Sequence, residues 1–189
     1  MKTVLFRQHG GPDKLSYEDL PIPTIGSEEV LVRVKACALN HLDIWIRQGN
    51  PAYPMPLPHV SGSDVSGIVD QTGAQVDSVT VGQRVFVSPG ISCWKCEQCL
   101  AGRDNLCRSY GLLGAMTHGG YAEYVKVPFR NVLPIPENLS FEQAAAFPLV
   151  SVTASHMLFA LAGLQHGETV LIMGAGSGVG SMVVQMAKL

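Results

Sequence analysis

The chain has 189 residues, of which 47% are hydrophobic and 15% are charged, and its 13 basic and 15 acidic side chains give a net charge of −2. This composition excludes a disordered chain, and the length suits one domain, or one domain with part of a second. A near-neutral charge without a lysine or arginine run excludes nucleic acid and anionic lipid surfaces as partners. The uncharged stretch 144–165 includes Pro148, His156 and Gln165, so we interpret it as a buried helix rather than a membrane span. Arg7 comes too early for a secretory signal, and we expect a cytoplasmic protein.

The first 135 residues contain short runs of alternating apolar and polar residues, which are typical of half-buried strands. Turn residues such as Gly10-Gly11-Pro12 and Gly49-Asn50-Pro51 separate these runs. The pattern predicts a partly closed, mostly antiparallel barrel that is interrupted by one helix near Asn40–Gln48. Strands are expected at Thr3–Phe6, Val30–Lys35, Val65–Val69, Arg84–Val87 and Tyr121–Val127.

The pattern changes at Ser140. Ser140 and Gln143 have the spacing of a capping box, which predicts a helix over Phe141–Phe147, and Pro148 is expected to end or kink that helix. The remaining predicted elements are a helix at Val150–Leu161, an apolar strand at Glu168–Met173, a glycine-rich turn at Gly174–Gly180 and the start of a helix at Ser181–Leu189.

Four of the five cysteines lie within fifteen residues, in the pattern Cys93-x2-Cys96-x2-Cys99-x7-Cys107. Thiolates suit tetrahedral zinc, and four of them close its coordination sphere without leaving a position for substrate. The alternatives are disulfides, which a cytoplasmic chain disfavours, and a redox Cys-x-x-Cys pair, which does not explain four cysteines within fifteen residues. The spacing therefore predicts a structural zinc, and the fifth cysteine, Cys37, is interpreted as an ordinary buried thiol.

The glycine-rich turn lies between an apolar strand and a helix. Small residues there let the backbone approach a pyrophosphate, and a helix N-terminus supplies N–H groups and positive partial charge. The alternative is a tight turn without a ligand. We predict a dinucleotide site formed by Gly174, Gly176, Gly178, Val179 and Gly180. Because the sequence stops at Leu189, we expect only the beginning of a nucleotide-binding domain.

Several motifs together resemble the N-terminal part of the medium-chain dehydrogenase/reductase superfamily, which includes zinc-type alcohol dehydrogenases and quinone oxidoreductases. They are Gly26–Ala38, Gly62–Val69, Val81–Val85, the four cysteines, Gly119–Val125, Leu133–Ala146 and the glycine-rich turn. The resemblance implies a mainly β fold with helices: a GroES-like partly closed barrel with a zinc lobe, followed by the first β-α unit of a Rossmann fold. The implied divisions are a catalytic domain at 1–136 with its zinc lobe at 90–108, connecting helices at 137–166, and the truncated start of an NAD(P)-binding domain at 167–189.

The resemblance does not extend to the catalytic zinc ligands. Asn40, Ser63 and Leu149 stand where zinc enzymes of this superfamily have Cys, His and Cys, and Leu42 replaces the hydroxyl that relays the alcohol proton. A Lewis-acid zinc would polarise the substrate oxygen, so its loss disfavours alcohol oxidation. These departures match the zinc-free quinone oxidoreductase branch, although that branch often lacks the cysteine lobe that this chain keeps.

The resemblance implies roles for the remaining polar residues. We expect Asn40 to hydrogen-bond the acceptor oxygen and Asp43 to orient the active-site loop. His41 is either a contact of the cofactor pyrophosphate or a partly exposed helix residue. Thr153 either touches the nicotinamide amide or bonds to its own helix backbone. Two aromatic residues, Trp45 and Tyr53, either line the substrate cleft or belong to the core.

The leading hypothesis is an NAD(P)H-dependent oxidoreductase that transfers hydride to a quinone or enone. We expect its full-length form to be a homodimer or homotetramer. We expect this truncated chain to have no activity. One alternative is a zinc-dependent alcohol dehydrogenase with substitute ligands, for which His41, His59, Asp43 and Asp64 are candidates. The other is a non-catalytic, zinc-stapled fragment that binds a partner.

Overall fold

The computed structural model describes residues 1–49 and 55–189, and the turn expected at Asn50-Pro51 and the aromatic Tyr53 lie outside them. Its strands are β1 (Lys2–Phe6), β2 (Leu15–Asp19), β3 (Glu29–Ala38), β4 (Asp64–Thr72), β5 (Arg84–Val87), β6 (Gly90–Ile91), β7 (Gly111–Leu112), β8 (Tyr124–Pro128) and β9 (Val132–Pro134). Its helices are α1 (His41–Gln48), α2 (Glu97–Leu100), α3 (Phe141–Ala145), α4 (Pro148–Ser155) and α5 (Gly178–Met186), with short helical segments η1 (Pro12–Lys14), η2 (Asp104–Leu106), η3 (Phe129–Asn131) and η4 (His156–Leu161).

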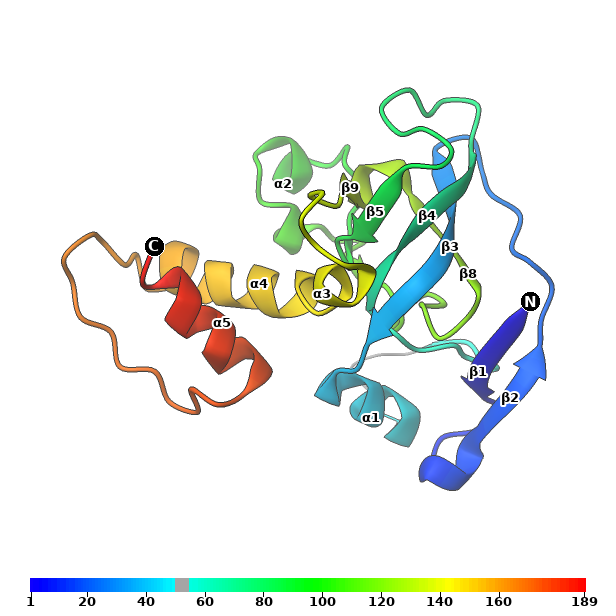
Figure 1. Ribbon diagram of the computed structural model, residues 1–189, viewed down its shortest axis with the longest axis horizontal. Coiled ribbons are helices and arrows are strands. Elements are labelled where there is room, and N and C mark those ends of the chain that lie inside the picture. The colour runs from blue at the N-terminus through cyan, green and yellow to red at the C-terminus, as the bar shows by residue number, and fades with distance from the viewer. Residues whose placement is uncertain (50–54) are drawn as a thin grey trace.

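Five strands form one antiparallel sheet in the order β8-β3-β4-β5-β9, and β1 pairs with β2 in a separate hairpin (Figure 1). This architecture confirms the predicted mainly β fold with helices. The edge strands β8 and β9 do not pair with each other, so the sheet is not closed into a barrel. Two register shifts in the β3–β4 pair, at Leu31/Val32 and at Val34/Ala36, are irregularities of the kind that bend a strand.

The sheet buries one continuous apolar core. Val30 and Val32 on β3 are fully buried, while Arg33 and Lys35 are exposed, as period-2 alternation requires. The core continues through the neighbouring strands and the loops that follow them: Val65, Val69, Val79, Val85, Val87, Leu113, Val125, Val127 and Val132. At about 1.5–3 kcal/mol for each buried aliphatic side chain, this cluster is the main stabilising contribution to the domain.

Three glycines bring the loop after β7 against the segment that precedes β4. Gly119 and Gly120 donate to the carbonyls of Val60 and Gly62 at 2.8 Å. A Cβ on Gly119 would overlap the carbonyl oxygen of Gly62, and a Cβ on Gly114 would lie 2.6 Å from it. Only glycine permits this approach, which also places Tyr121 next to the start of β4.

The C-terminal part differs from the prediction in two places. Pro148 is the first residue of α4 instead of the end of α3, a position where its missing N–H costs no hydrogen bond. The strand expected at Glu168–Met173 is wrong, because these residues form no strand and, except for Ile172, are exposed. A strand of a parallel sheet pairs with at least one other strand and has both faces covered, and no described segment pairs with this one.

The last helix packs on the helix that leads away from the sheet. α5 lies beside α4, and Val183 of α5 is buried with Ala154 and Leu158 (Figure 1). α5 begins three residues earlier than expected, because the Ser177 hydroxyl caps it by accepting from Gly180 N at 3.0 Å.

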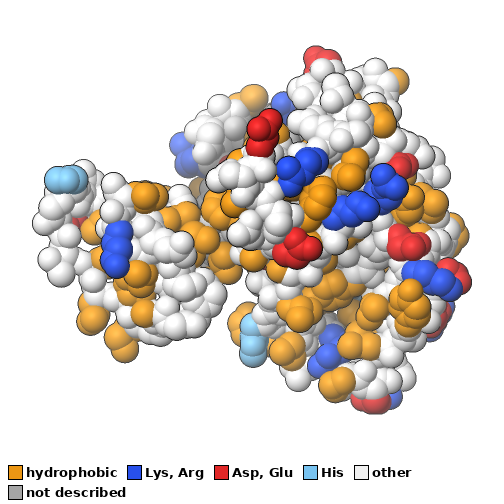
Figure 2. Space-filling model, viewed as in Figure 1, with side chains coloured by type: hydrophobic (Ala, Val, Ile, Leu, Met, Phe, Trp, Pro, Cys, Tyr) orange, Lys and Arg blue, Asp and Glu red, His pale blue; other side chains and the backbone are white. Residues whose placement is uncertain are grey.

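Hydrophobic side chains lie on the surface of this C-terminal part (Figure 2). Leu161, Leu171 and Met173 are 72%, 85% and 83% exposed. No helix within the described residues is both long enough and apolar enough to cross a membrane.

Replacing Gly119 by Ala tests the glycine contact. The added methyl meets backbone atoms of Gly62 that cannot rotate away, so we expect a loss of about 3 kcal/mol in the free energy of unfolding. The measurement is urea denaturation followed by circular dichroism. Gly176→Ala is the control, because an added methyl there has no atom within 4 Å. Equal urea midpoints for the two variants would contradict the close contact between Gly119 and Gly62.

Candidate functional site

The junction of β3 and α1 places three sequence-predicted residues next to one another. Asn40 precedes α1 with extended backbone angles, and His41 is the first helical residue. Asp43, the third residue of α1, reaches back so that its carboxylate accepts from Asn40 N at 2.7 Å. This arrangement satisfies an N–H at the helix start and favours a negative charge there.

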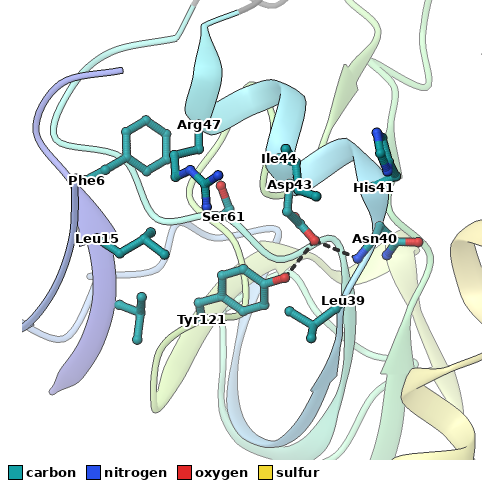
Figure 3. Close-up of a pocket in the computed structure, with 11 residues that line it drawn as sticks. Phe6, Leu15, Leu39, Asn40, His41, Asp43, Ile44, Arg47, Ser61 and Tyr121 are labelled. Atoms are coloured by element: carbon teal, nitrogen blue, oxygen red, sulfur yellow. Dashed lines mark hydrogen bonds between the residues drawn. The ribbon is translucent and has the colours of Figure 1, made fainter. Parts of the chain in front are cut away.

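Asp43 is also a hydrogen-bond acceptor for two distant segments, and Figure 3 shows its bond with Tyr121. The hydroxyl of Tyr121 donates to its Oδ2 at 2.6 Å, and Gly62 N donates to its Oδ1 at 3.3 Å. Burial and the Asp43 carboxylate both raise the pKa of Tyr121, so this hydroxyl stays protonated and remains a donor. Sequence analysis did not identify Tyr121, because its partner lies 78 residues away in the chain.

Asp64, the first residue of β4, is 1% exposed and also accepts two hydrogen bonds. Asn40 Nδ2 donates to its Oδ2 at 2.9 Å, and Leu149 N donates to its Oδ1 at 2.7 Å. Burial raises the pKa of Asp64 to about 6, although both hydrogen bonds favour the ionised form. Antiparallel pairing of Ala38 with Asp64 explains the contact, since Asn40 follows directly after the end of β3.

Two cavities meet at Asn40. A cleft of about 740 Å³ separates the sheet from α4 and α5, and its polar lining includes Asn40, His41, Asp64, Thr153 and Ser177. A pocket of about 380 Å³ lies between β1 and α1 (Figure 3) and is lined by Val4, Phe6, Leu15, Leu39, Asn40, His41, Asp43, Ile44, Arg47, Ser61 and Tyr121. Asn40 therefore lines both spaces.

The predicted cofactor residues are only partly brought together. His41, Thr153, Gly178 and Val179 line the 740 Å³ cleft, but Gly174, Gly176 and Gly180 do not. Gly180 is buried against Gly174 and Ala175, which tightens the turn. The N-terminus of α5 therefore faces the cleft through its first two residues, and its N–H groups suit a phosphate.

The hydroxyl of Thr153 donates to the Leu149 carbonyl at 2.8 Å. Thr153 therefore bonds to the backbone of its own helix, as the second of its two interpretations expected. Its side chain still lines the cleft. His41 is exposed, and its ring lies edge-on to Trp45 with a centroid distance of 4.8 Å.

The four clustered cysteines converge on one point. All four Sγ atoms lie within 4.8 Å of one another, with Cys93–Cys99 at 3.9 Å and Cys96–Cys99 at 3.5 Å. A tetrahedral zinc with bonds of about 2.3 Å places its sulfurs about 3.8 Å apart, so these thiols fit the ion. Backbone N–H groups of Lys95 and Cys96 lower the pKa of Cys93 to about 6, which favours the thiolate that a metal requires.

Substitute ligands for a second metal do not assemble. Among the described residues, the cysteine cluster is the one group of three or more metal-ligating side chains with converging ligand atoms. His59 is fully buried away from the cleft, where its Nε2 bonds to the Gly114 carbonyl at 3.0 Å. Asp43 and Asp64 use both of their oxygens as acceptors for the donors described above.

Replacing Cys99 by Ser tests the metal site. We expect one zinc per chain in the unaltered protein and none after the substitution, because a serine hydroxyl is a poor ligand for zinc. Elemental analysis after dialysis against a weak chelator measures the ratio. Cys37→Ala, which removes a thiol outside the cluster, should keep the metal. Disulfides among these cysteines in the purified chain would contradict the prediction.

Replacing Tyr121 by Phe tests the Asp43 network. The substitution removes one donor to a carboxylate, so the free energy of unfolding should fall by about 2 kcal/mol. Tyr17→Phe is the matched control, because Tyr17 is 70% exposed and its substitution should leave the urea midpoint unchanged. Equal stability of both variants would show that the bond contributes nothing.

Comparison with known proteins places this site in a family. Residues 26–137 match the alcohol dehydrogenase GroES-like domain. An alcohol dehydrogenase of Geobacillus stearothermophilus is 36% identical over 190 residues, which cover 100% of this chain and 55% of that protein. A quinone oxidoreductase of Mus musculus is 32% identical over 189 residues, which cover 100% of this chain and 49% of that protein.

Solved structures agree. A crystal structure of an NAD-dependent alcohol dehydrogenase superposes with a TM-score of 0.95 at 51% identity, over 100% of this chain and 55% of that one. A thermostable alcohol dehydrogenase from Pyrobaculum aerophilum, with cobalt and zinc bound, gives 0.91 at 35% identity, over 100% of this chain and 56% of that one. This chain spans about half the length of these relatives. It belongs to the alcohol dehydrogenase GroES-like domain family, and thereby to the medium-chain dehydrogenase/reductase superfamily.

Proposed function

We propose that this protein is a nicotinamide-dependent oxidoreductase of the quinone-oxidoreductase type, which reduces a conjugated carbonyl compound such as a quinone or enone. The observation that carries the proposal is the carboxamide of Asn40, held by Asp64 where the 740 Å³ cleft meets the 380 Å³ pocket. The cleft brings together a polar donor, which can bind the acceptor oxygen, and the N-terminus of a helix, which can bind a pyrophosphate.

The cofactor would occupy the cleft between the sheet and α5. Gly178 and Val179 at the start of α5 would offer backbone N–H groups to its pyrophosphate, with His41 on the opposite wall. When bound, a reduced nicotinamide supplies the hydride. The protein orients the two reactants and limits the access of water.

Asn40 would act on the acceptor oxygen. As a conjugated carbonyl is reduced, negative charge develops on its oxygen, and a fixed N–H donor stabilises that charge more than the neutral starting state. One hydrogen of Asn40 Nδ2 points to Asp64, which leaves the second available to the acceptor. After hydride transfer the oxygen takes one proton from solvent, which completes the reduction.

The cysteine lobe would bind a structural zinc. Its four thiolates would fill the coordination sphere, so this ion would hold residues 93–107 together and take no part in the reaction. The zinc-bound state of the Pyrobaculum relative and the fit of the four thiols support this assignment.

A zinc-dependent alcohol dehydrogenase is the second candidate, and the names of two relatives favour it. The site favours the first candidate, because Asn40, Ser63 and Leu149 offer an amide, a buried hydroxyl and an aliphatic group instead of strong zinc ligands. Metal content separates the two, since one zinc per chain supports the quinone-reductase type and two support the alcohol dehydrogenase.

Replacing Asn40 by Ala tests the proposed reaction. We expect NAD(P)H-dependent reduction of a quinone to fall by about 100-fold in kcat, since one donor to a developing oxyanion is removed. The assay follows the oxidation of NAD(P)H by a quinone in the unaltered protein and in the variant. Gln75→Ala, which removes an exposed carboxamide far from the cleft, should leave the rate unchanged. Zinc-stimulated alcohol oxidation without quinone reduction would overturn the proposal in favour of the second candidate.

A further inference from the structure

A single buried carboxylate connects three elements that enclose the cleft. Asp64 lies on β4, its Oδ2 accepts from Asn40 at the start of α1, and its Oδ1 accepts from Leu149 in the first turn of α4. These bonds span 24 and 85 residues of sequence. We propose that Asp64 is a positioning residue, which in its ionised form fixes the Asn40 carboxamide and the N-terminus of α4 on the two sides of the cleft.

The burial of this carboxylate is not explained by stability. Asp64 is 1% exposed, and none of the ion pairs within residues 1–49 and 55–189 includes it. Because burial raises its pKa to about 6, the folded chain binds the proton more tightly than the unfolded chain does. The contribution of Asp64 to stability is therefore greatest below about pH 4 and is lost as the pH rises through 6. The fold is therefore less stable with Asp64 ionised at neutral pH than with Asp64 protonated at low pH, a pattern that is common for residues that serve a site.

The first bond selects the orientation of Asn40. An ionised carboxylate accepts hydrogen bonds and donates none, so it binds the amide nitrogen of Asn40 and excludes the flipped amide, whose oxygen would face Asp64. A neutral residue at position 64 would permit either orientation. The charge therefore determines which end of the carboxamide is held.

The second bond anchors α4. Pro148 has no N–H, so Leu149 supplies the first main-chain donor of the helix, and a carboxylate at this end also interacts favourably with the helix dipole. α4 carries Thr153 into the cleft and packs against α5. Fixing its first turn therefore fixes one wall of the cleft relative to Asn40 on the other.

The charged and titratable groups near Asp64 come from few elements. Asp43 on α1 raises its pKa further, and Cys37 on β3 and Tyr121 after β7 are within electrostatic range of it. His41 lines the same cleft. α4 has no titratable residue, and the one on α3, Glu142, is exposed. Protonation of Asp64 should therefore weaken both hydrogen bonds together. The pH at which each bond is half weakened should be the same, because this one carboxyl group determines it.

Nuclear magnetic resonance of this 189-residue chain tests the connection without any assay of activity. We expect the side-chain amide of Asn40 and the main-chain amide of Leu149 to titrate together between pH 5 and pH 7, about the pKa near 6 of Asp64. The side-chain signal is the critical one, because Asp43 contacts only the main-chain N–H of Asn40.

Asp64→Asn should abolish both titrations, and Asp70→Asn, a matched change on the same strand, should preserve them. Independent titrations of the two amides in the unaltered chain, or their persistence in Asp64→Asn, would overturn the proposal. The unaltered chain decides the matter alone if Asp64→Asn does not fold.

A kinetic measurement extends the test, and this part rests on the proposed function. In the enzymatically active protein, kcat for quinone reduction should fall below an apparent pKa near 6, and Asp64→Asn should remove that dependence and lower kcat on the order of 10-fold. Asp64→Glu, which keeps the charge, should restore the pH dependence. A pH-independent kcat in the unaltered enzyme would overturn the positioning role, whereas absence of any quinone reduction alongside intact amide titrations would overturn the proposed function alone.

Discussion

The geometry of the site depends on two carboxylates that are held by hydrogen bonds instead of by cations. Asp43 and Asp64 lie at the end of the β3–β4 pair, and their donors come from α1, from the segment before β4, from the loop after β7 and from α4. Each bond to a charged acceptor contributes about 1.5–3 kcal/mol against the cost of removing the carboxylate from water. Both carboxylates, of which Asp64 is fully buried, therefore keep their hydrogen bonds only while the surrounding segments stay in place, which makes the site sensitive to the packing around it.

That packing is set by backbone contacts more than by side chains. Gly62, Gly114 and Gly119 approach one another so closely that side chains would not fit, and this contact brings Tyr121 to Asp43. Ser61 and Ser63 lie in the same segment, and each buries a hydroxyl oxygen without a hydrogen-bond partner among the described residues. Ser61 also lines the pocket between β1 and α1, although its hydroxyl oxygen is itself buried.

Sequence patterns predicted those helices and strands that are determined by residues close together in the chain. Alternation identified β1, β3, β4 and β5 within a few residues, and the Ser140–Gln143 capping box identified the start of α3. The strand at Glu168–Met173 was wrong, since apolar composition cannot show whether neighbouring strands exist. β2 was missed because Leu15–Asp19 is a short, largely exposed strand with only β1 as its partner.

The prediction of site residues was likewise limited to those whose contacts lie close together in the chain. The cysteine cluster lies within fifteen residues, and its spacing was enough to predict that the four thiols converge. Tyr121 and the two bonds of Asp64 depend on contacts between residues 24 to 85 positions apart, which no local pattern encodes. The resemblance placed Asn40, Ser63 and Leu149 where relatives coordinate a catalytic zinc, and the structure shows what connects two of these positions in this chain. Asn40 and Leu149 both donate to Asp64, so a carboxylate joins the segments that a metal would otherwise hold together. A hydrogen-bonded carboxylate can fix geometry but cannot polarise a carbonyl as a Lewis acid does, so the proposed reaction would rely on a neutral donor to orient the hydride acceptor.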